Sequence, residues 1–402
     1  MSSATETPLV AAKVTIRPGS LWARLPALGM VLGLLGVGGV AWMSGRPQQF
    51  YFSYLTAFIY FLSLALGALF FVLVQHATRA GWSVVVRRAA EVVAATLPLF
   101  AVLFLPLLAG VHDLFHWTHA DVVRGDELLR HRQPYLNLTF FQVRAALYFV
   151  VWTGLGLGYY LLSVRQDRTG EHAISRRLRT WSAPGLMLFA LSLTFAAFDW
   201  VMSLDPHWYS TIFGVYFFAG SLVSLFAFLA LLALGLRRSG VSGGAITVEH
   251  LHDLGKLLFA FTCFWAYIAF SQFMLMWYAN IPEETVYFLR RLSGSWRTLS
   301  LVLMVGHFAA PFLFLLPRTI KRSGAGLGLG AVWMLVMHYA DIYWLVMPNL
   351  HPKGMQPHLL DLACFVAVGG LFVTAAATLL RRAPVLPIGD PRLPESRSFE
   401  NQ

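Results

Sequence analysis

The chain has 402 residues, of which 57% are hydrophobic and only 12% are charged, and its net charge is +11. An ordinary soluble domain carries roughly 25% charged residues, so this composition excludes a soluble enzyme and indicates an integral membrane protein. The positive charge is explained by membrane topology, because the basic residues cluster in alternate loops, and no nucleic-acid partner is expected. Cys263 and Cys364 lie in apolar segments and provide no disulfide framework, no haem attachment motif and no metal-binding spacing.

Ten apolar segments are each long enough to cross about 30 Å of hydrocarbon as a helix. They predict an all-α membrane protein with spans near 25–43, 51–74, 84–110, 138–162, 183–202, 211–236, 253–279, 298–317, 328–347 and 358–380. The polar residues 1–24 are expected to form a cytoplasmic segment without a cleavable signal peptide, and residues 25–380 the ten-helix membrane domain. A glycine-rich linker is expected near 237–250. Residues 381–402 contain four prolines and are expected to form a disordered cytoplasmic tail.

The distribution of Lys and Arg predicts the orientation of the chain in the membrane. If the N-terminus is cytoplasmic, 21 of the 30 basic residues lie in cytoplasmic segments and 8 lie on the other side, with Arg144 inside a span. Cytoplasmic loops carry the excess of Lys and Arg in membrane proteins. Both termini are therefore expected to be cytoplasmic, and the composition places the chain in a membrane as a multi-pass protein.

Two segments on the outer side are longer than simple turns. Residues 111–137 are rich in His and acidic residues, and residues 280–296 carry two glutamates followed by two arginines. His112, His116 and His119 have helical spacing and could bind a metal ion, but no further ligand is evident in the sequence. A solvated docking surface is the favoured interpretation, and no bound metal is predicted.

The turn between the fifth and sixth spans is unusually polar and aromatic for its expected depth, near the lipid headgroups. It includes Asp199, Asp205, His207, Trp208 and Tyr209. Tryptophan and tyrosine here fit an aromatic belt around a proline-containing turn. Ionisable groups beside hydrocarbon are costly and usually functional, so the same residues are candidates for an outer polar pocket that could contact a quinone.

Ionisable residues also lie at the inner ends of two spans. Glu91 follows Arg87 by four residues and could pair with it, or it could take up protons. At the start of the seventh span, His252, Asp253 and Lys256 share one helix face. This group fits an ordinary helix start and fits a proton uptake site equally well.

Further ionisable residues lie deeper in the last three spans. His307 and His338 are expected near mid-membrane, and Asp341 lies on the same helix face as His338. Asp361 in the tenth span faces the outer half, where Asp199, Asp341 and Asp361 could line an outward cavity. His307 and His338 would lie below these carboxylates, and Glu91, Asp253 and Lys256 would lie at the cytoplasmic end. Together these residues predict two half-channels that meet near the centre of the membrane.

Three sequence runs resemble the F subunit of bacterial alternative complex III, a quinol:electron-acceptor oxidoreductase. The runs are DWVMSLDPHWYSTIFGVYFFAG at 199–220, HDLGKLLFAF at 252–261 and FWAYIAFSQFMLMWYANIPEE at 264–284. The resemblance implies the polysulfide-reductase-like membrane fold, with two four-helix bundles plus peripheral helices, in the bacterial inner membrane. It also implies proton conduction and assembly as the role of this chain, without catalytic residues or redox centres of its own.

The resemblance further implies partners that hold the redox centres. These partners are a sister membrane subunit that oxidises quinol, an iron–sulfur protein, multihaem and monohaem cytochromes c carrying haem c, and lipids. A quinone is the one cofactor that this chain itself could contact. Two alternatives stay open from the sequence. One is a free-standing secondary transporter, against which the two halves show no obvious repeat. The other is a b-haem anchor that uses His307 and His338, with His76 as a further ligand.

Overall fold

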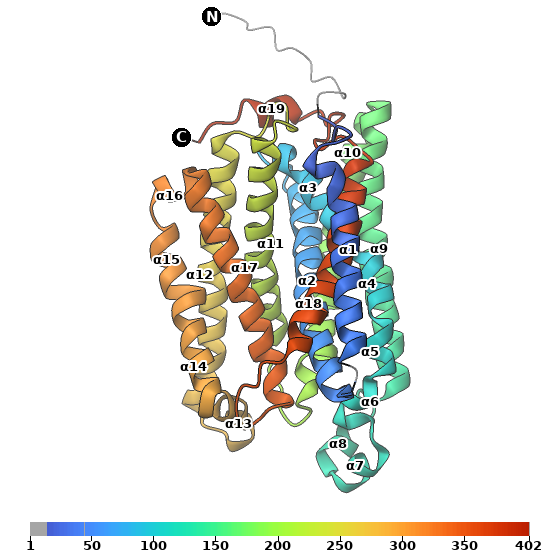
Figure 1. Ribbon diagram of the computed structural model, residues 1–402, viewed down its shortest axis with the longest axis vertical. Coiled ribbons are helices and arrows are strands. Elements are labelled where there is room, and N and C mark those ends of the chain that lie inside the picture. The colour runs from blue at the N-terminus through green and yellow to red at the C-terminus, as the bar shows by residue number, and fades with distance from the viewer. Residues whose placement is uncertain (1–13, 44, 402) are drawn as a thin grey trace, which may run out of the picture.

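The structure is a computed structural model that describes residues 14–43 and 45–401, and in these residues it is built from helices (Figure 1). Ten helical segments are long and apolar enough to cross a membrane, as the sequence predicts. Single helices form six of them: α1 (Leu21–Trp42), α2 (Pro47–Ala77), α9 (Leu138–Thr169), α11 (Phe213–Arg238), α12 (Val248–Ala279) and α18 (Leu359–Arg381). In two more, α10 (His172–Trp200) continues into a short 3-10 turn at Met202–Leu204, and α17 (Gly324–Val346) continues into one at Met347–Asn349.

The third and eighth spans are interrupted where proline occurs. The third consists of α3 (Val84–Ala94), α4 (Leu97–Leu103) and α5 (Leu105–Ala109), and a proline lies at the start of both α4 and α5. The eighth consists of α14 (Gly294–Val302), a π-helical segment (Leu303–Ala309) and α15 (Ala310–Leu315), which begins with Pro311. Proline has no backbone N–H to continue an α-helical ladder, so the chain adopts wider or shorter turns before it.

Short helices connect the spans at the two ends of the molecule. The segment after the third span contains α6 (Val111–Leu114), α7 (Ala120–Gly125) and α8 (Glu127–Arg132), with a 3-10 turn at His116–Thr118. At the same end lie α13 (Pro282–Arg291) and a 3-10 turn at Met347–Asn349, and we call this end the loop face (Figure 1). The other end carries α16 (Arg318–Arg322) and α19 (Leu393–Arg397), and we call it the tail face.

The burial of the helices separates central from peripheral ones. In α2, 89% of the most apolar stretch is buried, because α3, α10, α11 and α18 all pack against it. In α1 the corresponding value is 17%, and α1 packs chiefly along α18. Glycines allow this approach, because a Cβ at Gly370 would lie 2.3 Å from the backbone nitrogen of Gly33. Small residues commonly mediate close helix contacts in membranes.

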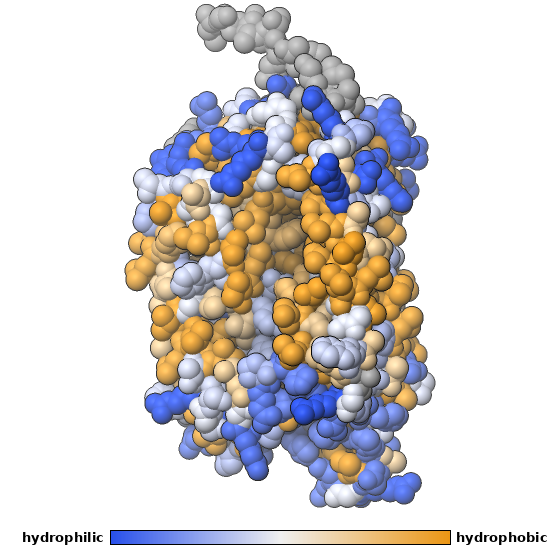
Figure 2. All heavy atoms as spheres, in the orientation of Figure 1, coloured by the Kyte–Doolittle hydropathy of each residue, from blue (hydrophilic) through white to orange (hydrophobic). Residues whose placement is uncertain are grey.

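The surface has the layered hydropathy of a membrane protein. On the face shown in Figure 2, a broad hydrophobic zone covers the middle of the molecule and hydrophilic side chains gather at both ends. The backbone N–H of Val385 donates to the carbonyl of Val14 (2.9 Å), so the start of the described chain and the segment after α18 lie together at the tail face. An even number of spans places both ends of the chain on the same face.

Buried basic side chains hold the connections at both faces. Arg291 of α13 is 1% exposed and donates to the carbonyls of Trp344 (3.2 Å), Leu345 (2.9 Å) and Tyr287 (3.2 Å). It thereby satisfies acceptors at the C-terminal end of α17, which a helix cannot satisfy internally. Burial lowers the pKa of this guanidinium. Lys321 caps α15 in the same way, through the carbonyls of Leu315 (2.5 Å) and Leu316 (2.7 Å).

The C-terminal tail differs from the prediction of disorder. Residues 383–401 pack across the tail face and include α19, and Val385 and Leu386 are completely buried. The hydroxyl of Ser396 accepts from the N–H of Val85 (3.2 Å) and donates to the carbonyl of Trp82 (2.7 Å). The prolines bend this segment, and its apolar side chains fill the space under the helix ends. Composition alone could not show this, because the covering surface is made by distant helices.

Candidate functional site

A cluster of polar side chains lies deep between α2, α11, α12, α17 and the π-helical segment. Asp341 of α17 accepts hydrogen bonds from the hydroxyl of Tyr216 and from the indole N–H of Trp265 (3.1 Å). His338, one turn earlier on α17, hydrogen-bonds through Nε2 with the hydroxyl of Ser63 (2.8 Å). We call these residues, together with His307, the central cluster. The sequence placed the two histidines and Asp341 at this depth, and the structure brings them together.

His307 completes the central cluster from the eighth span. Its ring centroid lies 3.9 Å from that of Trp265. Both of its nitrogens, and Nδ1 of His338, are buried without a hydrogen-bond partner among the described residues. π-Helical turns inside α-helices occur often at functional sites, and here the turn carries His307 into the protein interior. Unpaired buried nitrogens are expected to bind internal water.

A second polar group lies between the start of α18 and the start of α2. The carboxylate of Asp361 accepts from the hydroxyl of Ser53 (2.5 Å), from the side-chain amide of Gln49 (3.3 Å) and from the backbone N–H of His358 (2.8 Å). The carbonyl oxygen of Gln49 hydrogen-bonds with Nε2 of His351 (2.8 Å), and burial lowers the pKa of this imidazole. Asp361 thus caps its own helix and links two spans near the loop face.

The group predicted at the start of α12 lies at the tail face. Lys256 forms an ion pair with Asp253 and donates to the side chain of Asn401 (2.7 Å). His252 is 6% exposed, and its Nδ1 has no hydrogen-bond partner within the described chain. His250, which the sequence analysis did not select, bonds to the carbonyl of Ser396 (2.9 Å) and ties α12 to the tail.

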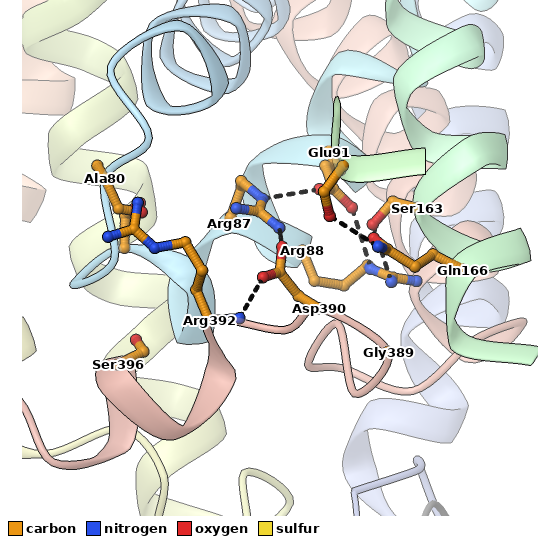
Figure 3. A network of polar contacts seen from close by, with 12 residues as sticks. Ala80, Arg87, Arg88, Glu91, Ser163, Gln166, Gly389, Asp390, Arg392 and Ser396 are labelled. Carbon is orange, nitrogen blue, oxygen red and sulfur yellow. Dashed lines mark hydrogen bonds and ion pairs between the residues drawn. The ribbon is translucent and has the colours of Figure 1, made fainter. Parts of the chain in front are cut away.

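Glu91 belongs to a buried ion network rather than to a single pair (Figure 3). Its carboxylate contacts Arg87 (3.2 Å) and Arg88 (3.1 Å), and all three side chains are at most 4% exposed. Arg87 also pairs with Asp390 of the tail, and Arg88 pairs with Asp167 of α9 (2.7 Å). The predicted pair with Arg87 is therefore present, and it belongs to a network in which two arginines are shared by three carboxylates.

The polar turn after α10 does not form one pocket, and this corrects the prediction for Asp199. Its carboxylate is fully buried and accepts two hydrogen bonds from Arg144 (2.8 Å each) and one from Tyr148 (2.8 Å). Asp199 therefore has no free oxygen that faces Asp341 or Asp361, and the three carboxylates occupy separate sets of partners. The sequence analysis missed Arg144 as the partner, although its position inside a span signalled a buried charge.

The other members of this turn lie near the loop face with separate partners. His207 is exposed and bonds to the carboxylate of Asp126 (2.5 Å), and this hydrogen bond lowers the pKa of Asp126. Asp205 pairs with Arg290 of α13 (3.1 Å). Trp208 is buried, and its ring stacks on that of Tyr287 with centroids 3.8 Å apart.

Trp208 and Tyr209 also line a pocket of about 420 Å³ at the loop face. Its walls come from three segments of the chain: the end of α8 with the residues that follow it, the end of α10 with the 3-10 turn, and the residues Pro206, Trp208 and Tyr209. Asp199, Asp205 and His207 do not line it.

Two of the three histidines of the outer segment lie side by side, because the ring centroids of His112 and His119 are 5.6 Å apart. His112 bonds through Nδ1 with the hydroxyl of Thr118 (3.0 Å), and His119 bonds through Nε2 with the carbonyl of His112 (2.9 Å). Within residues 14–43 and 45–401, no group of three or more His, Cys, Asp or Glu side chains could hold a metal ion.

Comparison with known proteins gives no family for this chain. No protein-family model matches it, and no curated protein matches it at a significant level.

Proposed function

We propose that this chain conducts protons as a membrane subunit of a quinol:electron-acceptor oxidoreductase of the alternative complex III type. The observation that carries the proposal is the central cluster, where Asp341, His307 and His338 are buried together with unpaired nitrogens. Ionisable side chains inside a membrane are costly and mark ion or proton pathways. Carboxylate and imidazole groups exchange protons readily when water connects them.

The proposed path has an outer and an inner half. The outer half runs from Asp361 and its partners near the loop face to the central cluster. The inner half begins at the tail face, at the group around Asp253 and Lys256, with Glu91 as a second starting point. Internal water would join these groups, since the side chains of the three regions do not bond directly to one another.

The orientation and bundle arrangement belong to the same proposal. The excess of basic residues supports a cytoplasmic position for the tail face, and the resemblance to a bacterial complex supports the bacterial inner membrane. The packing of the helices supports two four-helix bundles. The first bundle contains α2, the third span, α9 and α10, and the second contains α11, α12, the eighth span and α17. The remaining helices, α1 and α18, would be peripheral. Partner subunits would supply the quinol-oxidising site, the iron–sulfur clusters and haem c.

Purification of the chain in mild detergent through a C-terminal tag tests its place in the complex. We expect c-type haem and quinol:cytochrome c reductase activity to elute with the chain. A colourless, inactive single chain would contradict the proposal and favour a free-standing transporter. The b-haem alternative predicts a haem spectrum from the chain alone.

Substitution of Asp341 tests proton conduction itself. Asp341→Asn keeps the shape of the side chain and one accepting oxygen, whereas Tyr216 and Trp265 donate to different oxygens of the carboxylate, and the amide cannot carry a proton. We expect the complex to assemble and its proton-coupled turnover to fall, and we expect Asp253→Asn to have the same effect from the inner half. Asp205→Asn, at a partly exposed ion pair of the loop face, is the matched control. Wild-type proton translocation in both test variants would contradict the proposal.

A further inference from the structure

A polar pocket of about 330 Å³ lies at the tail face, and no residue of the central cluster lines it. One wall comes from the start of α12 and from α16, and the other comes from residues 397–401 of the tail. The volume is within the range of about 300–1,000 Å³ that is usual for small-molecule sites. Because two segments far apart in the sequence form its walls, a ligand in this pocket would contact both of them.

The lining of this pocket carries more positive than negative charge. Three arginines line it, Arg318 and Arg322 from α16 and Arg397 at the end of α19. Two carboxylates, Glu249 and Glu400, belong to the same lining. The guanidinium of Arg322 and the carboxylate of Glu249 balance each other, because two N–O contacts of 2.6 and 2.8 Å join them. The other three lining charges leave the pocket positive.

Arg318 is available to a ligand in this pocket. Its side chain is exposed and forms no ion pair within the part of the chain that the structure describes. Thr247 and Ser398 add hydroxyl groups to the same lining. Arginine presents paired N–H donors that match the oxygens of a phosphate group. A guanidinium without a counter-charge, beside hydroxyl groups, therefore favours a phosphate group as the ligand.

The lining favours a water-soluble anion over a lipid. Phe399 is the one apolar residue among those that line the pocket. Its ring packs against the rings of His250 and Trp82, with centroids 5.7 and 6.4 Å away. A phospholipid needs apolar surface for its acyl chains beside the headgroup, and these lining residues do not provide it.

We infer that this pocket binds the phosphate group of a small, soluble phosphorylated anion, with Arg318 and Arg397 contributing from its two walls. A phosphate monoester carries about −1.5 to −2 charges at pH 7, which the positive lining can balance. The tail already docks beside the pocket through Asn401, which donates to the carboxylate of Glu249 (3.1 Å) and accepts from Lys256 (2.7 Å). A ligand that binds only the docked tail stabilises that state, so it should hold the tail against α12 and α16.

Titration with pyrophosphate and with inorganic phosphate tests the inference. The full chain is purified in mild detergent through an N-terminal tag, together with any subunits that accompany it, so that the tail is unmodified. We expect isothermal titration calorimetry to detect binding, and we expect hydrogen–deuterium exchange in residues 393–401 to become slower. Potassium chloride at equal ionic strength is the control, because it screens charges without supplying a phosphate group.

Three variants locate the binding. Arg318→Gln removes the unpaired charge and should weaken pyrophosphate binding at least about tenfold. Glu400→Gln removes a carboxylate that repels the ligand and should strengthen the binding about twofold to fivefold. Arg176→Gln is the matched control, because Arg176 is exposed on α10 and does not line the pocket.

The outcomes separate this pocket from a general effect of surface charge and from the proposed function. No binding of either anion, or equal weakening by Arg318→Gln and Arg176→Gln, would overturn the site. Slower exchange with phosphatidylglycerol in mixed micelles, but not with pyrophosphate, would overturn the soluble ligand and assign the pocket to a lipid. The inference does not depend on proton conduction, so Asp341→Asn should leave pyrophosphate binding unchanged. Size-exclusion profiles check that each variant is folded.

Discussion

The buried pair of Arg144 and Asp199 gives the sharpest test of the structure. Asp199 is 0% exposed and receives three hydrogen bonds, two of them from one guanidinium. Arg144 also donates to the carbonyl of Tyr135 (3.0 Å), and its guanidinium lies 3.9 Å from the centre of that ring. Asp199→Asn therefore leaves a buried guanidinium without its counter-charge.

The expected loss follows from the burial of both partners. Removal of one member of a buried ion pair costs about 3–5 kcal/mol, because the remaining charge is uncompensated. Such a loss changes the ratio of folded to unfolded protein by about two to four powers of ten. Tyr148→Phe removes a single hydrogen bond to the carboxylate and should cost about 1.5–3 kcal/mol.

Equilibrium unfolding in mixed detergent and SDS micelles measures these losses. Asp205→Asn is the matched control, because the pair of Asp205 with Arg290 is partly exposed and should contribute about 1 kcal/mol or less. Replacement of both buried partners by Arg144→Met and Asp199→Leu should recover much of the loss. If Asp199→Asn unfolds within about 0.5 kcal/mol of the wild type, within the usual range for a surface substitution, the buried pair is refuted and Asp199 is again a candidate for the outer site.

Three further predictions concern the faces and the periphery of the molecule. Arg291→Met should lower the free energy of unfolding by at least about 3 kcal/mol, because it leaves the last carbonyls of α17 buried without donors; a thermal midpoint equal to that of wild type would contradict this. Gly370→Ala should push α1 away from α18 and lower the free energy of unfolding by about 1–3 kcal/mol, whereas Gly38→Ala, with open space around it, should change it little. Disulfide cross-linking between cysteines introduced into α1 and α18 measures their separation. If both variants lowered the cross-linking yield equally, the close contact at Gly370 would be contradicted. The hydrogen bond from His207 lowers the pKa of Asp126 in the folded protein. The contribution of this pair to stability should therefore be present above the pKa of Asp126 in the unfolded chain, near 4, and be lost as the pH falls through its lower pKa in the folded protein. Acid unfolding of a His207→Ala variant should lack this pH dependence.

Much of the fold could be predicted from the sequence, because the membrane constrains local structure strongly. A backbone in hydrocarbon must satisfy its hydrogen bonds within each helix, so apolar length alone predicts the ten spans. The helical period also placed Asp341 on the same face as His338. The depth of His307 followed from its position in the eighth span, although the π-helical turn that carries it did not.

The partners of the ionisable residues were decided by tertiary structure. The sequence predicts that Asp199 lines an outer polar pocket, and only the packing of α9 against α10 shows that Arg144 pairs with it. Likewise the tail read as disordered from its prolines, although Asp390 pairs with Arg87 across 303 positions of sequence. Hydropathy and periodicity act over a few turns of helix, and thus they determine which segments cross the membrane. Charge pairing and pocket shape depend on contacts between distant helices, and for that reason only the folded chain determines which polar groups are bound to each other and which remain open to a ligand.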